Sequence, residues 1–325
     1  MIQLYGTIGP DCSDLKTLTE MFKNGMTGVR INMVGTEFDE LAELVGTIRT
    51  AAEVSNVEPR ILLDLGSPLF RFGAMKRPLS LRAGDHVALG EGGVPIPQGV
   101  WKGLPSGTEI SADGGVVLSI TRVLDDYAEA VVLRPGALCA LEHFSVRNTD
   151  RPSSPFSLNE ILCIKQAASL GIYAIIPASI YTEASAVRRD LEEYGSGQLR
   201  LFWKIRCADD LAHLEDILPC VDEVILARAY LGSFCPLWKI PGLQKRLAAA
   251  CSAADRPYMI ASQLLSSMEH SPKPTAAELN DVFHAVEDGA SSLMLTGETA
   301  VGSYPAEAIR YLKKTVSEAQ ETRSA

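Results

Sequence analysis

Charged and polar side chains stand at the ends of several apolar segments, where a buried strand would give way to a loop. Lys204 and Arg206 end the segment L-R-L-F-W-K-I, and Arg30 and Asn32 end the segment G-V-R-I-N. Side chains alternate between the two faces of a strand, so each of these pairs shares a face. Comparable positions, at or just after the end of an apolar segment, are held by Asp64, Tyr230, Ser262, Gln263, Thr296 and Glu298.

These residues suit the binding of a small anion. Three of them are cations, and a guanidinium can hold a carboxylate or a phosphate through two parallel hydrogen bonds. Lys204 could act as an acid, a base or an imine-forming amine, and the charge of Arg206 beside it would lower its pKa. Tyr230 could donate a hydrogen bond to a developing oxyanion. Any one residue could instead form a salt bridge that seals the end of a sheet, but the whole set favours a binding site.

The elements that must position these residues alternate regularly between strand and helix. Amphipathic stretches predict helices at about 14–24, 37–54 and 157–169, and capping boxes at 157–160 and 275–278 mark helix starts. This alternation predicts an α/β fold, a parallel sheet closed as a (β/α)8 TIM barrel with its active site at the carboxyl ends of the strands. The eight predicted strands cover 2–8, 28–32, 60–65, 172–176, 199–205, 223–227, 258–261 and 292–295.

One region interrupts this alternation. It is rich in glycine and proline and contains β-type runs at 115–124 and 128–133. We therefore predict a small inserted β domain, lid-like in position, at 73–148. The barrel would then consist of 1–72 and 149–325.

The composition limits the classes of partner. A formal net charge of −10 argues against a nucleic acid, which would need a basic face. No apolar run approaches the ~20 residues of a membrane span, so we expect no membrane partner and a cytoplasmic location. The seven cysteines form no zinc-binding pattern. The partner expected from the residues is a small anionic substrate.

Several ordered motifs resemble the pyruvate kinase family. The resemblance covers nearly all of the barrel together with a shortened lid domain, and it does not extend to the regulatory domain that usually follows. It implies the barrel fold and association of copies into a homo-oligomer through barrel surfaces, with the oligomeric state left open. The motifs are G-T-I-G-P (6–10), V-R-I-N (29–32), L-D-L-G-S-P-L-F-R (63–71), I-A-S-Q-L-L-S-S-M (260–268) and L-T-G-E-T-A-V-G-S-Y-P-A-E-A (295–308).

The resemblance also implies roles for individual residues. Arg30 and Lys204 would contact the transferred phosphoryl group, and Lys204 would lie beside the enolate oxygen. Asn32 and Asp64 match ligands of the family's monovalent cation. The remaining matches are Ser262, in place of a threonine near the substrate, Arg71 at the hinge of the lid, and Gln263, Thr296 and Glu298 around the same site.

The departures from the family pattern concern the metal ions. Arg206 and Tyr230 replace the two carboxylates that hold the family's divalent cation, and Val34 replaces a serine beside the monovalent cation. Gly35 replaces a histidine near the nucleotide. An arginine cannot coordinate Mg²⁺, and phosphoryl transfer depends on such cations. We therefore expect no cofactor, no divalent metal and no efficient ATP-dependent phosphoryl transfer, and we leave a monovalent cation open.

The leading hypothesis is an enzyme that acts on a small keto acid, enol acid or phosphate-bearing oxyacid of the phosphoenolpyruvate or pyruvate type. Lys204, Arg206 and Tyr230 would be catalytic in metal-independent enolate chemistry, as a transferase or lyase of a specialised biosynthetic pathway. One alternative is a non-catalytic protein that senses such an anion. Another is a genuine pyruvate kinase with relocated metal ligands. Loss of function by drift is a further alternative, against which the retained glycine and polar motifs weigh.

Overall fold

The chain divides into two compact units in the computed structural model. The barrel unit comprises 1–66, 156–178 and 183–325, and the β unit comprises 67–155 and 179–182. The insertion predicted at 73–148 lies inside the range of the β unit. Within these units the structure describes residues 2–34, 40–65, 70–90, 92–96, 106–112, 114–140, 142–147, 156, 158–177 and 183–324.

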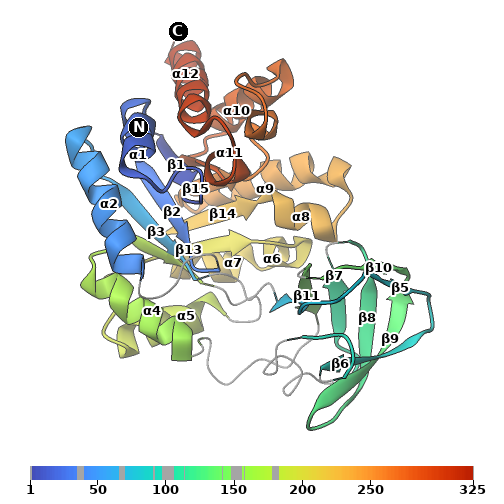
Figure 1. Cartoon of the computed structure of the whole chain (residues 1–325). Coiled ribbons are helices and arrows are strands. Elements are labelled where there is room, and N and C mark those ends of the chain that lie inside the picture. The colour runs from blue at the N-terminus through green and yellow to red at the C-terminus, as the bar shows by residue number, and fades with distance from the viewer. Residues whose placement is uncertain are drawn as a thin grey trace. The chain divides into compact units, whose positions relative to one another are not determined.

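Eight parallel strands close into a barrel, as the sequence predicts (Figure 1). Each strand pairs with its neighbours around the barrel in the order β1-β16-β15-β14-β13-β12-β3-β2. The β2–β3 ladder brings Asn32 opposite Asp64 at the carboxyl ends of both strands. The strands are β1 (Gln3–Thr7), β2 (Gly28–Asn32), β3 (Arg60–Asp64), β12 (Ala174–Ile176), β13 (Arg200–Ile205), β14 (Glu223–Ala227), β15 (Tyr258–Ala261) and β16 (Ser292–Leu295).

Helices surround this barrel. The capping box at the start of α10 is confirmed, because Thr275 and Glu278 exchange side-chain and backbone hydrogen bonds. The box expected at 157–160 includes Ser157, which lies outside the described residues. The helices are α1 (Leu15–Lys23), α2 (Leu41–Val54), α4 (Leu158–Ser169), α5 (Ala184–Glu193), α6 (Ala208–Ala212), α7 (Leu214–Ile217), α8 (Arg228–Phe234), α9 (Ile240–Ala253), α10 (Ala276–Glu287), α11 (Gly297–Ala300) and α12 (Pro305–Ser324), with 3-10 turns η2 (Leu218–Cys220), η3 (Leu237–Lys239) and η4 (Ser266–Glu269).

The inside of the barrel is packed with apolar side chains at mid-height. Phe202, Ile225, Met259 and Met294 belong to this inner core and are almost completely buried. Residues on the opposite faces of the same strands, such as Val224 and Leu293, pack in the larger core with the helices. A filled interior confines functional side chains to the strand ends.

The amino-terminal end of the barrel contains a polar cluster around the buried carboxyl group of Glu223. Ser291 donates a hydrogen bond to this carboxyl group at 3.2 Å. Nearby, the guanidinium groups of Arg60 and Arg200 lie 4.9 and 5.0 Å from the centroid of the Tyr173 ring. Burial, the largest influence, raises the pKa of Glu223, against the hydrogen bonds of its serine neighbours and the two arginines.

The β unit contains a six-stranded antiparallel sheet and a two-stranded sheet, in the orders β4-β11-β7-β8-β9-β6 and β10-β5. Its core is separate from that of the barrel and includes Phe72 and Phe144, whose ring centroids are 4.4 Å apart. The β-type runs of the sequence form β8 and β9. The strands are β4 (Phe70–Arg71), β5 (Leu79–Leu81), β6 (His86–Gly90), β7 (Glu109–Ala112), β8 (Val117–Val123), β9 (Tyr127–Arg134), β10 (Gly136–Leu138) and β11 (His143–Arg147).

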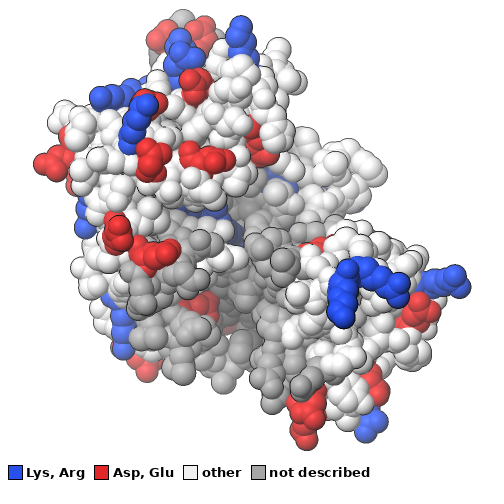
Figure 2. Space-filling model, viewed as in Figure 1, with Lys and Arg blue, Asp and Glu red and all other residues white. Residues whose placement is uncertain are grey.

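The surface charges of the barrel unit are mixed in sign. On the face shown in Figure 2, lysine and arginine side chains alternate with aspartate and glutamate side chains over this unit. That face carries no continuous basic surface of the kind that a nucleic acid backbone requires. Among the helices that the structure describes, none has the length and apolar character needed to cross a membrane.

The raised pKa of Glu223 leads to a prediction about stability. The unfolded chain releases this proton near the ordinary value of 4.5, whereas the folded chain retains it to higher pH. The stabilisation is therefore complete at acidic pH and is lost as the pH rises through the folded value. We expect Glu223→Gln to remove this contribution. The free energy of unfolding, measured by urea titration, should then fall less steeply than in the wild type as the pH rises above 4.5.

Glu53→Gln, on the exposed face of α2, is the matched control and should leave the slope of stability against pH unchanged. Identical slopes for the wild type and Glu223→Gln would contradict the prediction.

Candidate active site at the mouth of the barrel

A buried carboxylate organises the carboxyl ends of the strands, which we call the mouth. Asp64, the last residue of β3, is completely buried. Its Oδ2 atom lies 2.5 Å from Nζ of Lys204 and 2.6 Å from Nη2 of Arg30, and it accepts a further hydrogen bond from Nε of Arg30 at 2.8 Å. The mouth therefore contains an ion triad of one anion and two cations.

The barrel strands bring the members of this triad together from distant parts of the sequence. Arg30 lies on β2 next to β3, and its Nη1 also donates to the hydroxyl of Thr7 at 3.3 Å. Lys204 reaches Asp64 from β13, two strands away from β3 in the barrel order. Thr7 in turn donates to the carbonyl of Leu295 at 3.0 Å, which fixes its hydroxyl at the end of β1.

The triad changes the proton affinity of its members. Burial is the largest influence on Lys204 and lowers its pKa to about 8; Asp64 raises it, and Arg30 and Arg206 lower it. Burial of the Asp64 carboxyl opposes its ionisation, but Lys204 and Arg30 outweigh burial and hold its pKa far below the usual range. The amine thus titrates close to neutral pH, whereas the carboxylate stays charged.

Arg206 is the third cation of the mouth and follows β13 directly. Its side chain is buried, and Nη2 donates to the carbonyl of Pro177 at 2.9 Å. Asp210 accepts from the backbone N–H groups of Arg206 and Cys207 at 2.7 and 3.2 Å, which fixes the chain where the strand ends. Burial is the main cause that lowers the pKa of Arg206, and Asp210 and Tyr230 oppose it.

Tyr230 lies in α8, immediately after β14, and completes the predicted catalytic group. Nζ of Lys204 is 5.7 Å from the centroid of its ring. Tyr230 also interacts electrostatically with Arg206. The structure therefore brings Lys204, Arg206 and Tyr230 together, as expected from their strand ends.

The backbone after β15 is held in an unusual conformation at the predicted substrate residues Ser262 and Gln263. Both have positive φ, 72° and 55°, which side-chain-bearing residues adopt at a cost. The guanidinium of buried Arg228 donates to the carbonyl of Ser262 at 2.9 and 3.1 Å and to that of Gln263 at 2.6 Å. Its Nη1 binds Asp281 at 2.7 and 3.0 Å. This arrangement, the Arg228 clamp, fixes one wall of the mouth.

Thr296 and Glu298 form a second backbone anchor after β16. The buried carboxylate of Glu298 accepts from the N–H groups of Thr296 at 2.7 Å and Leu265 at 3.1 Å, and Thr296 Oγ1 lies 3.4 Å from it. These contacts tie two loops of the mouth together. A direct contact of either residue with substrate stays a prediction.

Two further predicted residues are Asn32 and Arg71. Asn32 accepts from the backbone N–H of Val34 at 3.3 Å and faces the same strand end as Asp64. The backbone of Arg71 belongs to β4 of the β unit, and its side chain lies outside the described residues. Gly35 also lies outside them.

Sequence reasoning missed three supporting residues, Thr7, Asp210 and Arg228. Thr7 carried a usable signal, since it is a polar residue at the end of an apolar strand. Arg228 belongs to the motif L-A-R-A-Y-L-G, but its acceptors lie 34 and more positions further along the chain. The contacts of Asp210 depend on how the chain turns after β13.

A closed eight-stranded barrel with a cationic mouth at the carboxyl ends of its strands defines a (β/α)8-barrel protein with a candidate anion site. The family model described as pyruvate kinase, barrel domain, matches residues 2–309. The chain therefore belongs to the pyruvate kinase family, as its motifs indicate.

Individual relatives agree with this assignment. A pyruvate kinase of Thermococcus litoralis is 31% identical over 99% of this chain and 70% of its own length. One of Bacillus licheniformis is 30% identical over 97% of this chain but only 56% of its own length. The crystal structure of a pyruvate kinase from Cryptosporidium parvum superposes with a TM-score of 0.83 at 24% identity, covering 98% of this chain and 69% of that chain, which supports the fold.

The expectation that this chain needs no cofactor is wrong. The pyruvate kinases to which it is related typically require a divalent metal ion and potassium, and nothing in the comparisons supports the absence of either. Asn32 and Asp64 offer adjacent oxygen donors that would suit potassium, which would add positive charge beside an anionic ligand.

The donors for a divalent metal fit less well. That Arg206 and Tyr230 stand in place of the family's two carboxylates stays a prediction of the resemblance, and neither side chain is a good ligand for Mg²⁺. In the part of the chain that the structure describes, no group of three or more histidine, cysteine, aspartate or glutamate side chains could hold a metal ion. These side chains do not form a divalent-metal site, and we derive no reaction step through one.

The Arg228 clamp predicts a specific loss of stability. Arg228→Gln would leave two carbonyl groups and Asp281 without their charged donor, and we expect the free energy of unfolding to fall by about 2–4 kcal/mol. Chemical denaturation measures this loss. Arg228→Lys should recover less than half of it, because an ammonium cannot reproduce the fork. The control is Arg246→Gln, which replaces an exposed arginine on α9 and should change the free energy of unfolding by less than about 0.5 kcal/mol. If Arg228→Gln changes it by no more than this control does, the clamp is refuted.

The ion triad predicts coupled effects at Asp64. Asp64→Asn would leave Lys204 and Arg30 facing each other without an anion, which should destabilise the fold by about 3–5 kcal/mol. It should also lower the pKa of Lys204 below its value of about 8, since Asp64 raises it. Denaturation and the pH dependence of the Lys204 Cε chemical shift measure the two effects.

Asp288→Asn is the matched control, because it removes the partner of the exposed Lys245 and should cost less than about 1 kcal/mol. A Lys204 pKa that stays unchanged or rises in Asp64→Asn would refute the triad.

Proposed function

We propose that this protein binds a small anionic oxyacid of the pyruvate or phosphoenolpyruvate type in the mouth and stabilises its enolate. The observation that carries the proposal is the buried Arg30–Asp64–Lys204 triad with Arg206 beside it. Three cations converge there, Arg30 from β2 and Lys204 and Arg206 from the end of β13. Such a preorganised cationic site favours an anion whose charge grows during reaction.

Lys204 is the residue best placed to manage the proton and the charge of the enolate. Its pKa of about 8 allows the amine to lose and regain a proton near neutral pH. In the charged form it would stabilise the enolate oxygen, and the buried surroundings would strengthen that interaction. Asp64 holds the amine in place through the contact of 2.5 Å.

Arg206 and Arg30 would hold the carboxylate or phosphate of the ligand. A guanidinium presents donors in a planar fork that matches either group. Arg206 is fixed by its bond to the Pro177 carbonyl and by the backbone contacts of Asp210. A fixed donor loses little conformational freedom when the ligand binds.

A second candidate function is phosphoryl transfer between ATP and pyruvate, which membership of the family favours. It requires a nucleotide and a divalent ion in addition to the oxyacid. A third candidate is a binding protein that recognises the oxyacid without turnover. Association of copies of the chain through barrel surfaces stays a prediction.

The proposal predicts exchange of the methyl protons of pyruvate. In deuterated buffer with Mg²⁺ and K⁺, we expect the wild type to exchange these protons, because enolisation releases one of them to the base. Lys204→Met should slow the exchange by about 100-fold or more, through loss of the proton-transferring group. Proton NMR of pyruvate follows the reaction. Arg246→Gln is the control and should exchange at the wild-type rate.

The other candidate functions give different results. Formation of ATP from ADP and phosphoenolpyruvate would establish phosphoryl transfer. Thermal stabilisation by pyruvate without exchange or ATP formation would favour the binding protein and contradict the enolate proposal. If pyruvate raises the melting temperature of neither the wild type nor Arg206→Gln, oxyacid binding is contradicted altogether.

A further inference from the structure

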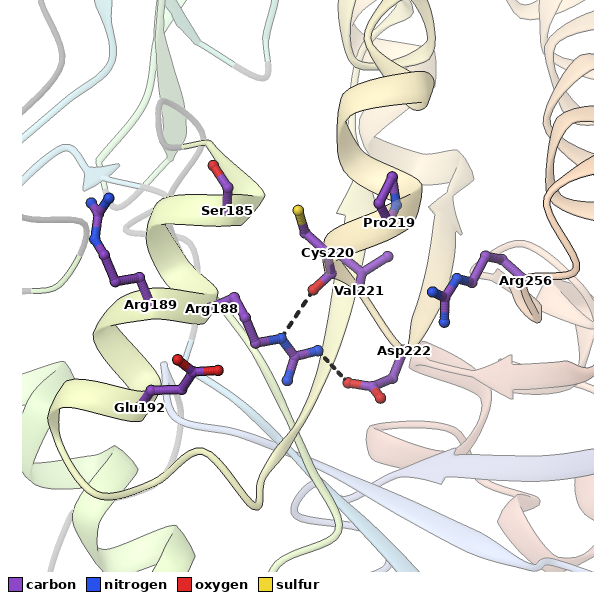
Figure 3. A pocket seen from close by; sticks show the side chains of 9 residues that line it. All are labelled: Ser185, Arg188, Arg189, Glu192, Pro219, Cys220, Val221, Asp222 and Arg256. Carbon is purple, nitrogen blue, oxygen red and sulfur yellow. Dashed lines mark hydrogen bonds and ion pairs between the residues drawn. The ribbon is translucent and has the colours of Figure 1, made fainter.

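A second polar site lies at the opposite end of the barrel from the mouth. It is a groove of about 500 Å³ between α5 and the segment that leads from η2 into β14 (Figure 3). Asp222 and Arg256 line it, and they precede β14 and β15 respectively. The groove is therefore on the amino-terminal side of these strands, and no residue of the mouth contributes to it.

The groove gathers cations although the chain as a whole is acidic. Arg188, Arg189 and Arg256 line it together with the carboxylates of Glu192 and Asp222, a formal excess of one positive charge that includes Arg189, whose side chain points away from Arg188 (Figure 3). The chain carries a formal net charge of −10. A local excess of cations on an acidic protein creates a field that concentrates small anions.

Arg188 is fixed in the middle of the groove. Its Nε donates to the carbonyl of Cys220 at 3.0 Å and its Nη2 binds Asp222 at 2.5 Å, while Nη1 reaches the carbonyl of Leu199 at 3.5 Å (Figure 3). Asp222 is itself held by the N–H of Leu201 at 2.7 Å. A guanidinium has five N–H groups, so two of those of Arg188 have no acceptor among the described residues.

Arg256 supplies a second cation to the groove. Its side chain is half-buried and approaches from the side of Asp222, whereas Arg189 on α5 points away from Arg188 (Figure 3). Within the described part of the chain, the Arg256 side chain has no hydrogen bond or ion pair. Its charge is therefore available to a ligand that also binds the two remaining N–H groups of Arg188.

We propose that this groove binds a small organic phosphate monoester. Arginine side chains match the geometry of a phosphate, and Arg188 and Arg256 would hold it from two sides. The remaining wall includes Pro219 and Val221, which suit a short carbon skeleton. The volume of about 500 Å³ equals that of roughly 17 water molecules at about 30 Å³ each, which is more than a free phosphate ion requires.

Calorimetric titration with glycerol 3-phosphate at constant ionic strength tests this site. We expect Arg256→Gln to weaken binding at the groove at least tenfold and Arg189→Gln at most threefold, because Arg189 points away. Arg246→Gln, an arginine outside the groove, should bind within twofold of the wild type. Any binding at the mouth is common to all these variants. The wild-type and Arg256→Gln titrations therefore differ only by the groove, and identical titrations overturn the proposal.

Two further comparisons locate and define the ligand. Cys220 lines the groove, so bound glycerol 3-phosphate should slow its alkylation at least fivefold. The alkylation rate of the exposed Cys139 should stay unchanged. Peptide mass spectrometry measures both rates. Glycerol should give no protection and no heat. If inorganic phosphate binds as tightly as glycerol 3-phosphate, the proposal of a monoester site is overturned in favour of a site for the free ion. Equal protection of Cys220 in Arg256→Gln would overturn the assignment to the groove.

Discussion

The mouth of this barrel depends on a single buried carboxylate. Asp64 has no exposed surface, yet it binds Lys204 and Arg30, which are themselves largely buried. Taking such charges out of water is costly, and only short, well-directed contacts repay that cost. Removing the anion would leave two cations in contact in a region of low dielectric. The positions of Lys204 and Arg30 therefore follow from this one side chain, which also opposes the lowering of the Lys204 pKa by burial and by the neighbouring arginines.

The rest of the mouth is built on backbone anchors that fix the loops after β15 and β16. The Arg228 clamp holds the strained residues Ser262 and Gln263, and Glu298 ties the N–H groups of Thr296 and Leu265. Neither anchor needs a ligand to be complete. The polar cluster at the other end of the barrel, around Glu223, is likewise satisfied largely within the protein. Within the mouth, side-chain charge directed at a ligand is thus concentrated where the triad and Arg206 meet.

Sequence reasoning could predict the strands and the strand-end residues, because both follow from local pattern. Apolar runs mark buried parallel strands, and a charge such as Lys204 at the end of one has few structural uses. The Arg228 clamp could not be predicted, since it depends on acceptors 34 or more positions away and on a local backbone turn. The cofactor prediction failed for another reason. It depended on the side chains of Arg206 and Tyr230 alone, which are poor metal ligands, whereas the related pyruvate kinases typically require metal ions.

The charge balance of the mouth is the strongest physical argument for an anionic ligand. Arg30, Lys204 and Arg206 converge there, and Asp64 is the carboxylate that binds two of them through its side chain. Two further carboxylates of the mouth, Asp210 and Glu298, are directed at backbone N–H groups rather than at these side chains. The mutual repulsion of the cations contributes, after burial, to the lowered pKa of Lys204. An oxyacid that brings a carboxylate or phosphate would offset that repulsion, so the close approach of the three cations would strengthen binding.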